Sequence, residues 1–303
     1  MTSWTRKAAM ALIGISAAAP VLADDTSFDR HFSVSPGGEL TLDTDVGSVV
    51  IVGRDGHELD VHATVSGSAD FLGHFSIMAV QGPQGVTVTG RMQRLGWLGE
   101  WFESGRHRVT YTIELPRDYV TDIRTSGGSL DLRHLSASTQ GRTSGGSVTV
   151  DDVHGEVRMR TSGGRIEASE LAGPADLRTS GGSIDVSGCT GDLTARTSGG
   201  SIRLERIDGS VQAYTSGGSV TAEVRSNRGV SLATSGGSIA LLLPANAVGS
   251  LDAHTDGGRV ESTIPLSSVV IASRNELRGA INGGGQQILL RTSGGSIRVG
   301  ALD

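Results

Sequence analysis

A six-residue motif, RTSGGS, returns along most of this chain of 303 residues and constrains its fold more than any other feature. The first five intervals between motif threonines are 18 residues each, and the later ones are 19, 21 and 37. The threonines are Thr125, Thr143, Thr161, Thr179, Thr197, Thr215, Thr234, Thr255 and Thr292. A fixed short period is the signature of stacked supersecondary units. The motif therefore predicts an architecture, because a catalytic motif would normally occur once.

Within one repeat, GDLTARTSGGSIRLERID at 191–208, apolar and polar residues alternate with the two-residue period of a β-strand. Leu193 and Ala195 point inward before the motif, and Ile202 and Leu204 point inward after it. We expect each coil to be two short strands separated by two turns, with positive φ at the glycine pair. The predicted fold class is all-β: a single-chain β-solenoid or β-helix with coils of about 18 residues.

Stacked coils lie about 4.8 Å apart, so equivalent side chains form columns along the stack. Two inward columns are apolar: Leu130, Val148, Ile166, Ile184 and Ile202, and then Leu135, Val153, Leu171, Cys189 and Ile207. Cys189 is the single cysteine and replaces an aliphatic residue, which favours a buried thiol over a reactive one. The Thr and Ser hydroxyls of each TSGG are expected to satisfy backbone groups of the turns.

The first 23 residues resemble a secretory signal, with Arg6 and Lys7 followed by an apolar run and small residues before a cleavage site after Ala23. Residues 24–120 are expected to form an irregular N-terminal β region. It holds a degenerate first coil, LTLDTDVGSVVIV at 40–52, and stretches typical of hairpins that would cap the stack.

The TSGG-type solenoid is expected over residues 121–303. After Thr255 the doubled interval predicts one enlarged or irregular coil before the last motif. The chain ends shortly after a repeat strand, which predicts an exposed pairing edge at the C-terminal coil unless another segment covers it. Such an edge favours self-association through this coil or pairing with another envelope protein.

Without the leader, 24 arginines stand against 32 acidic residues, a formal charge of −8, and no lysine remains. This balance disfavours nucleic acid as a partner. The leader predicts an exported protein, periplasmic or secreted and associated with the cell surface, and no transmembrane segment is expected in the mature chain.

The opening GGELTLDTDVGSVVIVG, the join YTIELPRDYVTDIRTSGGSL and the serial TSGGSI coils resemble the DUF4097 family of bacterial β-strand-repeat proteins, which are labelled candidate adhesins. The resemblance covers nearly the whole mature chain. It implies a β-helix-like fold and a cell-envelope setting, and it brings no catalytic residues.

The residue before each motif threonine is arginine in five consecutive coils, and these arginines should form an outward column: Arg124, Arg142, Arg160, Arg178 and Arg196. The corresponding column on the opposite face is mostly acidic or neutral over the same coils. Two interpretations remain open for the arginines. Either local carboxylates such as Asp122 and Asp176 neutralise them, or the guanidinium row binds a repeating anion such as an acidic polysaccharide or lipopolysaccharide.

A second candidate contact is the aromatic segment LGWLGEWFESG at 95–105, with Trp97, Trp101 and Phe102. It is either a hairpin tip folded over the stack or an exposed site for a protein partner. In the second case the chain would be a structural or envelope-stress-sensing module that binds another envelope protein.

An enzyme related to polysaccharide-degrading β-helices is the third alternative, and it rests on fold analogy alone. The outward carboxylates are scattered rather than clustered in pairs, and the serines lack a nucleophile elbow. The eight histidines have no zinc-ligand spacing, and the aspartates of LDTD and TDGG are best explained by turns rather than calcium. The sequence therefore favours a non-enzymatic protein with no cofactor.

Overall fold

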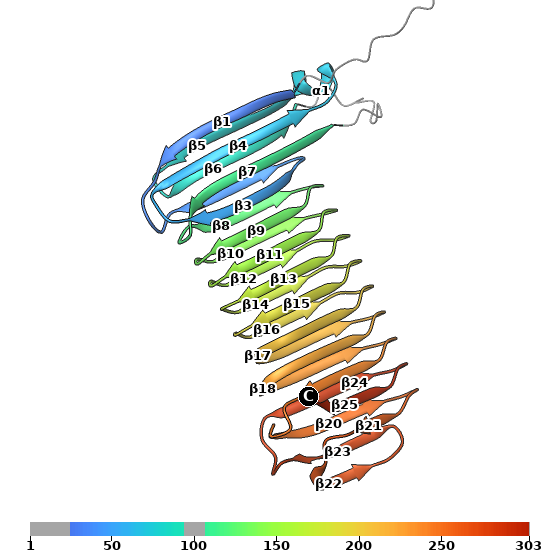
Figure 1. The fold of residues 1–303 in the computed structure, drawn as a ribbon. Coiled ribbons are helices and arrows are strands. Elements are labelled where there is room, and N and C mark those ends of the chain that lie inside the picture. The colour runs from blue at the N-terminus through green and yellow to red at the C-terminus, as the bar shows by residue number, and fades with distance from the viewer. Residues whose placement is uncertain (1–24, 94–106, 303) are drawn as a thin grey trace, which may run out of the picture.

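The computed structural model of the protein describes residues 25–93 and 107–302, which form a long stack of strands lying across the molecular axis (Figure 1). The strands pair into two ladders that run along the stack and enclose an apolar interior between them. Pairing is parallel throughout the middle of the stack and antiparallel only near its two ends. β17 (Ile202–Thr215) and β18 (Val220–Thr234) belong to both ladders and join them into one sheet.

The first ladder carries the strands that precede each TSGG turn. Its order is β5 (Phe75–Gly82), β6 (Gly85–Met92), β2 (Glu39–Thr44), β8 (Val120–Thr125), β10 (Thr139–Thr143), β12 (Val157–Arg160), β14 (Ala175–Arg178), β16 (Leu193–Arg196), β17, β18, β24 (Gln287–Thr292), β20 (Gly249–Thr255), β23 (Glu276–Ile281) and β22 (Leu266–Ala272).

The second ladder carries the strands that follow each TSGG turn. Its order is β1 (Asp25–Ser33), β4 (Glu58–Ser66), β7 (Arg108–Pro116), β3 (Ser48–Arg54), β9 (Leu130–Leu135), β11 (Val148–Val153), β13 (Ile166–Leu171), β15 (Ile184–Cys189), β17, β18, β19 (Ile239–Leu243), β25 (Ile297–Ala301) and β21 (Val260–Ser262).

The predicted all-β repeat architecture is confirmed: the sheet is mostly parallel, and the register advances by one repeat per strand, consistent with a solenoid-like fold. The two predicted inward columns are also confirmed. Ile166 pairs with Val148 and Ile184, and Leu171 pairs with Val153 and Cys189. All six side chains are buried. Burial raises the pKa of the Cys189 thiol, which keeps it protonated and weakly reactive.

The threonine of each motif joins consecutive coils through its buried hydroxyl. Thr161 Oγ1 donates to the carbonyl oxygen of Gly146 in the preceding coil at 2.8 Å and accepts from the Gly164 amide at 3.2 Å. The expected hydroxyl ladder is therefore confirmed for the threonines. The serine that takes part is the one after the glycines, because Ser183 Oγ accepts from the Ser201 amide at 3.2 Å.

Positive φ at the TSGG glycine pairs was expected and is wrong, because none of these glycines has positive φ in the described part of the chain. The second glycine of each pair is required by a close approach of backbones instead. A Cβ on Gly164 would lie 2.0 Å from the carbonyl oxygen of Gly146, where no side chain fits. Gly163, the first glycine of this pair, has room for a side chain, since a Cβ there would meet no atom nearer than 3.7 Å.

Positive φ occurs at the other turn of the coil, mostly on residues with side chains. His134, Asp152, Glu170 and Arg206 occupy equivalent positions with φ between 50° and 58°. Left-handed backbone is unfavourable for such residues. Their side chains pair along the stack: His134 Nδ1 lies 2.8 Å from Asp152 Oδ2, and Glu170 reaches over Gly188 to Arg206 at 2.6 Å.

The C-terminal coil does not lie at the end of the stack, and other strands cover the pairing edge that would otherwise be exposed there. β24 pairs with β18 on one side and β20 on the other, and β25 lies between β19 and β21. Figure 1 shows the C-terminus inside the stack, with the β22–β23 hairpin beyond it. Inside the stack, the backbone N–H and C=O groups on both edges of this coil form hydrogen bonds. At the end of the stack, only the groups on one edge would do so.

The N-terminal end is also rearranged. β2 and β3, which hold the segment expected to form the first coil, stack on β8 and β9 with Thr44 opposite Thr125. However, β6 and β7 come later in the chain and stack outside β2 and β3, so part of the 24–120 region continues both ladders. β1, β4, β5 and the helix α1 (Ala69–His74) complete this end. No helix among the described residues has the length and hydropathy to span a membrane.

Candidate functional site

The five predicted arginines lie opposite one another on five consecutive strands of the first ladder. Arg142 pairs in register with Arg124 and Arg160, and Arg178 pairs with Arg160 and Arg196. They occupy outward positions because the alternation places their neighbours in the interior, such as Ile123 next to Arg124. We call these five residues the arginine column. The backbone positions of its members repeat at the strand spacing of about 4.8 Å.

Part of the arginine column is neutralised locally, as one of the two interpretations expected. Arg124 and Arg178 each lie 2.7 Å from a carboxylate two residues earlier, Asp122 and Asp176. Arg160 lies 3.7 Å from the same Asp176 carboxylate, in the next coil. Between 40% and 49% of these three arginine side chains remains exposed, so the pairs are screened by solvent and add little stability.

Two members of the column have no carboxylate partner within the described residues. Arg142 donates to the side-chain oxygen of Gln140 at 3.4 Å, which leaves its charge uncompensated. Arg196 forms no ion pair with any described residue and is exposed. The next position in the column is Tyr214, which pairs in register with Arg196 and is 44% exposed. The uncompensated charge therefore lies at Arg142 and at the Arg196 end.

Toward the N-terminal end of the stack, the position that follows Arg124 in the arginine column is an aspartate. Asp43 pairs in register with Arg124, and Arg91 binds Asp43 at 2.5 Å and Asp45 at 3.2 Å. The hydrogen bond from Arg91, helped by the charge of Arg124, holds the pKa of Asp43 below its usual value. This carboxylate would repel an anion that extended past Arg124.

The opposite face has the acidic column expected from the sequence. Asp131, Glu167 and Asp185 lie at matching positions on β9, β13 and β15. Asp131 is held by Arg133 at 2.6 Å, and Glu167 by Arg165 at 3.0 Å. These two carboxylates are therefore neutralised locally, as part of the arginine column is.

The other predicted contact residues, Trp97, Trp101 and Phe102, lie outside the described residues, as do the leader residues 1–23. Within the part of the chain that the structure describes, no three His, Cys, Asp or Glu side chains converge as a metal site would require.

Sequence reasoning missed a cluster of charged residues on the outer face of β1 and β4. Antiparallel register places His31 opposite Asp60 and Asp29 opposite His62. His31 Nδ1 lies 2.6 Å from Asp60 Oδ1, and His62 Nδ1 lies 2.5 Å from Asp29 Oδ1. The segments FDRHF at 28–32 and DVH at 60–62 each contain one aspartate and one histidine. Which aspartate faces which histidine depends on the register of β1 and β4, which only the tertiary structure gives.

The His31–Asp60 pair predicts a pH-dependent attachment of β1. Their hydrogen bond raises the pKa of His31 above 6.5 and lowers the pKa of Asp60 below 3.8. The stabilisation of β1 attachment by protonated His31 is complete below pH 6.5. It is lost as pH rises through the pKa that His31 has in the folded protein. The stabilisation by ionised Asp60 is complete above pH 3.8 and is lost as pH falls through the pKa that Asp60 has in the folded protein. Attachment of β1 is therefore expected to be strongest between these two values.

An NMR titration of the histidine rings checks this expectation. Asp60→Asn should lower the His31 pKa, because the carboxylate that favours imidazolium is removed. Asp29→Asn is the matched control, since Asp29 contacts His62 and not His31. The same His31 pKa in wild type and Asp60→Asn would contradict the assigned cause.

The stacked parallel coils, the inward apolar columns and the polar outer columns define a β-repeat protein. The family model described as toastrack DUF4097 matches residues 38–300. The chain belongs to the DUF4097 family, which confirms the resemblance seen in its motifs. No curated protein matches the sequence.

Several solved structures align with the chain at low sequence identity. A candidate adhesin from Bacteroides fragilis NCTC 9343 is 13% identical with a TM-score of 0.44, over 90% of this chain and 97% of the other. A candidate lipid binding protein from Parabacteroides distasonis ATCC 8503 is 12% identical with a TM-score of 0.45, over 91% and 97%. A candidate cell adhesion protein from Clostridium sporogenes ATCC 15579 is 12% identical with a TM-score of 0.26, over 91% and 100%. These alignments assign no ligand to this chain.

Proposed function

We propose that this protein is a non-enzymatic, exported cell-envelope solenoid that binds an anionic polymer along the arginine column. The single observation that carries the proposal is the register of the five arginines, which repeats one cation per coil on one face. The leader-like residues 1–23 support export to the periplasm or cell surface. Acidic polysaccharide and the phosphates of lipopolysaccharide are the proposed ligand classes.

The proposed ligand lies lengthwise on the stack. A guanidinium group offers a planar fork of donors that matches carboxylate or phosphate. Arg142 and Arg196 supply charge that no described carboxylate compensates, while Arg124, Arg160 and Arg178 would exchange weak surface pairs for ligand contacts. Because the mature chain is negative overall, attraction must come from this face and should weaken steeply with salt.

The test is binding of the purified mature chain to alginate and to lipopolysaccharide across a sodium chloride series. Changing all five arginines of the column to Gln should weaken binding by about tenfold or more, since a hydrogen bond to a charged group contributes about 1.5–3 kcal/mol. The matched control changes Arg133, Arg203, Arg225, Arg228 and Arg298 to Gln, which removes the same charge outside the column. Equal binding by the two variants would rule out the column as the site.

A second candidate function is docking of another envelope protein at the distal end of the stack. β22 pairs only with β23 among the described strands, and its Val269 and Val270 are 56% and 75% exposed. This free edge replaces the one expected at the C-terminal coil. Loss of partner binding in Val269→Thr/Val270→Thr, with little dependence on salt, would favour this function over polymer binding.

A further inference from the structure

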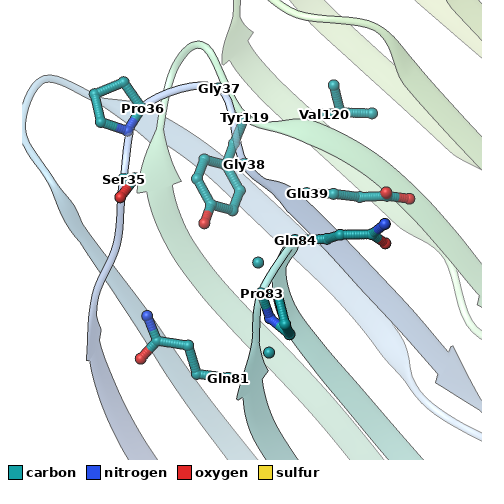
Figure 2. Close-up of a pocket in the computed structure, with 12 residues that line it drawn as sticks. Ser35, Pro36, Gly37, Gly38, Glu39, Gln81, Pro83, Gln84, Tyr119 and Val120 are labelled. Atoms are coloured by element: carbon teal, nitrogen blue, oxygen red, sulfur yellow. The ribbon is translucent and has the colours of Figure 1, made fainter.

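A hollow of about 480 Å³ lies at the N-terminal end of the stack, on the side of the coil away from the TSGG turns. Three segments that are distant in sequence build it: the turn before β2, the turn of the β5–β6 hairpin, and the start of β8. Figure 2 shows these segments around the hollow. A volume of this size suits a small ligand.

The ladder register brings the three segments together. Glu39 pairs with Gly85 on one side and Val120 on the other. The Glu39 amide donates to the Gln84 carbonyl oxygen at 2.9 Å, and the Val120 amide donates to the Gly38 carbonyl oxygen at 2.9 Å. The walls are therefore held by backbone hydrogen bonds, and the hollow exists without a ligand to shape it.

Tyr119 is the buried polar group of the hollow. Its side chain is 1% exposed, yet its hydroxyl makes no hydrogen bond with any described residue. Gly38 makes room for it, because a Cβ there would lie 2.3 Å from the Tyr119 hydroxyl oxygen. In Figure 2 this hydroxyl points into the space bordered by Ser35, Gln81 and Pro83. The hydroxyl reaches the hollow, so a ligand there could supply the hydrogen bond that no described residue makes.

Besides Tyr119, the described lining holds several polar side chains and carries almost no charge. Ser35 offers a hydroxyl, and Gln81 keeps its side-chain oxygen and one amide hydrogen free after donating the other to the Ser33 carbonyl oxygen at 2.8 Å. Glu39 is the one carboxylate of the lining, has no ion pair with a described residue, and lies at the rim beside Gln84. Among the residues that the structure describes, no arginine or histidine lines the hollow.

From this arrangement we infer that the hollow binds one neutral sugar residue. Sugar hydroxyls both donate and accept, which matches a phenol, a hydroxyl, an amide and a carboxylate around one space. Pro36 and Pro83 supply apolar surface for the C–H face of a pyranose. Glu39 disfavours uronic acids, so this site differs in ligand class from the arginine column and does not depend on it.

The experiment measures binding of the mature chain to the methyl glycosides of glucose, galactose, mannose and N-acetylglucosamine, and to methyl glucuronide, by saturation-transfer NMR and calorimetry. At least one neutral glycoside should bind, and the glucuronide more weakly than its glucose counterpart. Tyr119→Phe should weaken the neutral glycoside about threefold to tenfold, the effect of one hydrogen bond. Glu39→Gln should reduce the difference between glucoside and glucuronide.

Tyr214→Phe is the matched control, because it removes an exposed hydroxyl in another part of the stack and should leave glycoside binding unchanged. The inference fails if no neutral glycoside binds the wild type, if Tyr119→Phe binds as well as wild type, or if the glucuronide binds best. The five-arginine variant separates the two sites: it should lose alginate binding and keep glycoside binding.

Discussion

Gly164→Ala is expected to lower the free energy of unfolding by about 3 kcal/mol or more, near the upper end of what overpacking costs. The added Cβ would lie 2.0 Å from the Gly146 carbonyl oxygen and 2.5 Å from its carbon, and both are backbone atoms of the adjacent coil. The coils would have to separate at this turn, which breaks hydrogen bonds on both ladders. Urea unfolding followed by circular dichroism measures the loss.

The neighbouring glycine provides the matched control. Gly163→Ala adds the same methyl group one residue earlier, where the nearest atom is 3.7 Å away and φ is not positive. Its stability should stay within about 1 kcal/mol of wild type, because alanine also restricts the unfolded chain. The first coil already carries Val46 at the equivalent position, TDVGSV. Similar losses for both variants would disprove the backbone-contact explanation.

Thr161→Val is expected to lower the free energy of unfolding by about 2 kcal/mol or more. Valine keeps the shape of threonine but leaves the Gly146 carbonyl oxygen and the Gly164 amide without the hydroxyl that bonds them at 2.8 and 3.2 Å. A buried polar group left without a partner costs about 1–3 kcal/mol. Hydrogen exchange should show faster exchange at the Gly164 amide.

Thr161→Ser separates the contribution of the hydroxyl to stability from that of the methyl group. Serine keeps both hydrogen bonds and loses one buried methyl, a cost of about 1 kcal/mol. The serine variant should therefore be more stable than the valine variant. The reverse order would mean that packing of the methyl group, and not the hydroxyl ladder, holds this turn.

Particular residues show why some features could be predicted. The inward positions of Ile166, Leu171 and Cys189 follow from two-residue alternation and a constant period, both of which are local properties of the chain. The arginine column followed from the same period. Its partial neutralisation was also foreseeable, since Asp122 and Asp176 stand two residues before an arginine on the same face.

Other features depended on contacts between distant segments. The role of Gly164 is decided by the backbone of the preceding coil, and the glycine pair alone suggested positive φ instead. The hollow at Tyr119 needs the β5–β6 turn, which lies more than one coil away in the sequence. The His31–Asp60 pair likewise depends on an antiparallel register between β1 and β4.

The sequence by itself determined the all-β repeat, the coil length, the inward columns and the row of arginines, because these follow from periodicity along one chain. Only the tertiary structure decided the order of the coils at both ends, where β24 and β25 insert between earlier strands and β6 and β7 lie outside β2 and β3. The physical reason is that backbone hydrogen bonds between parallel coils are the same for any neighbour. Which coils meet is therefore settled by burial and edge pairing across the whole stack.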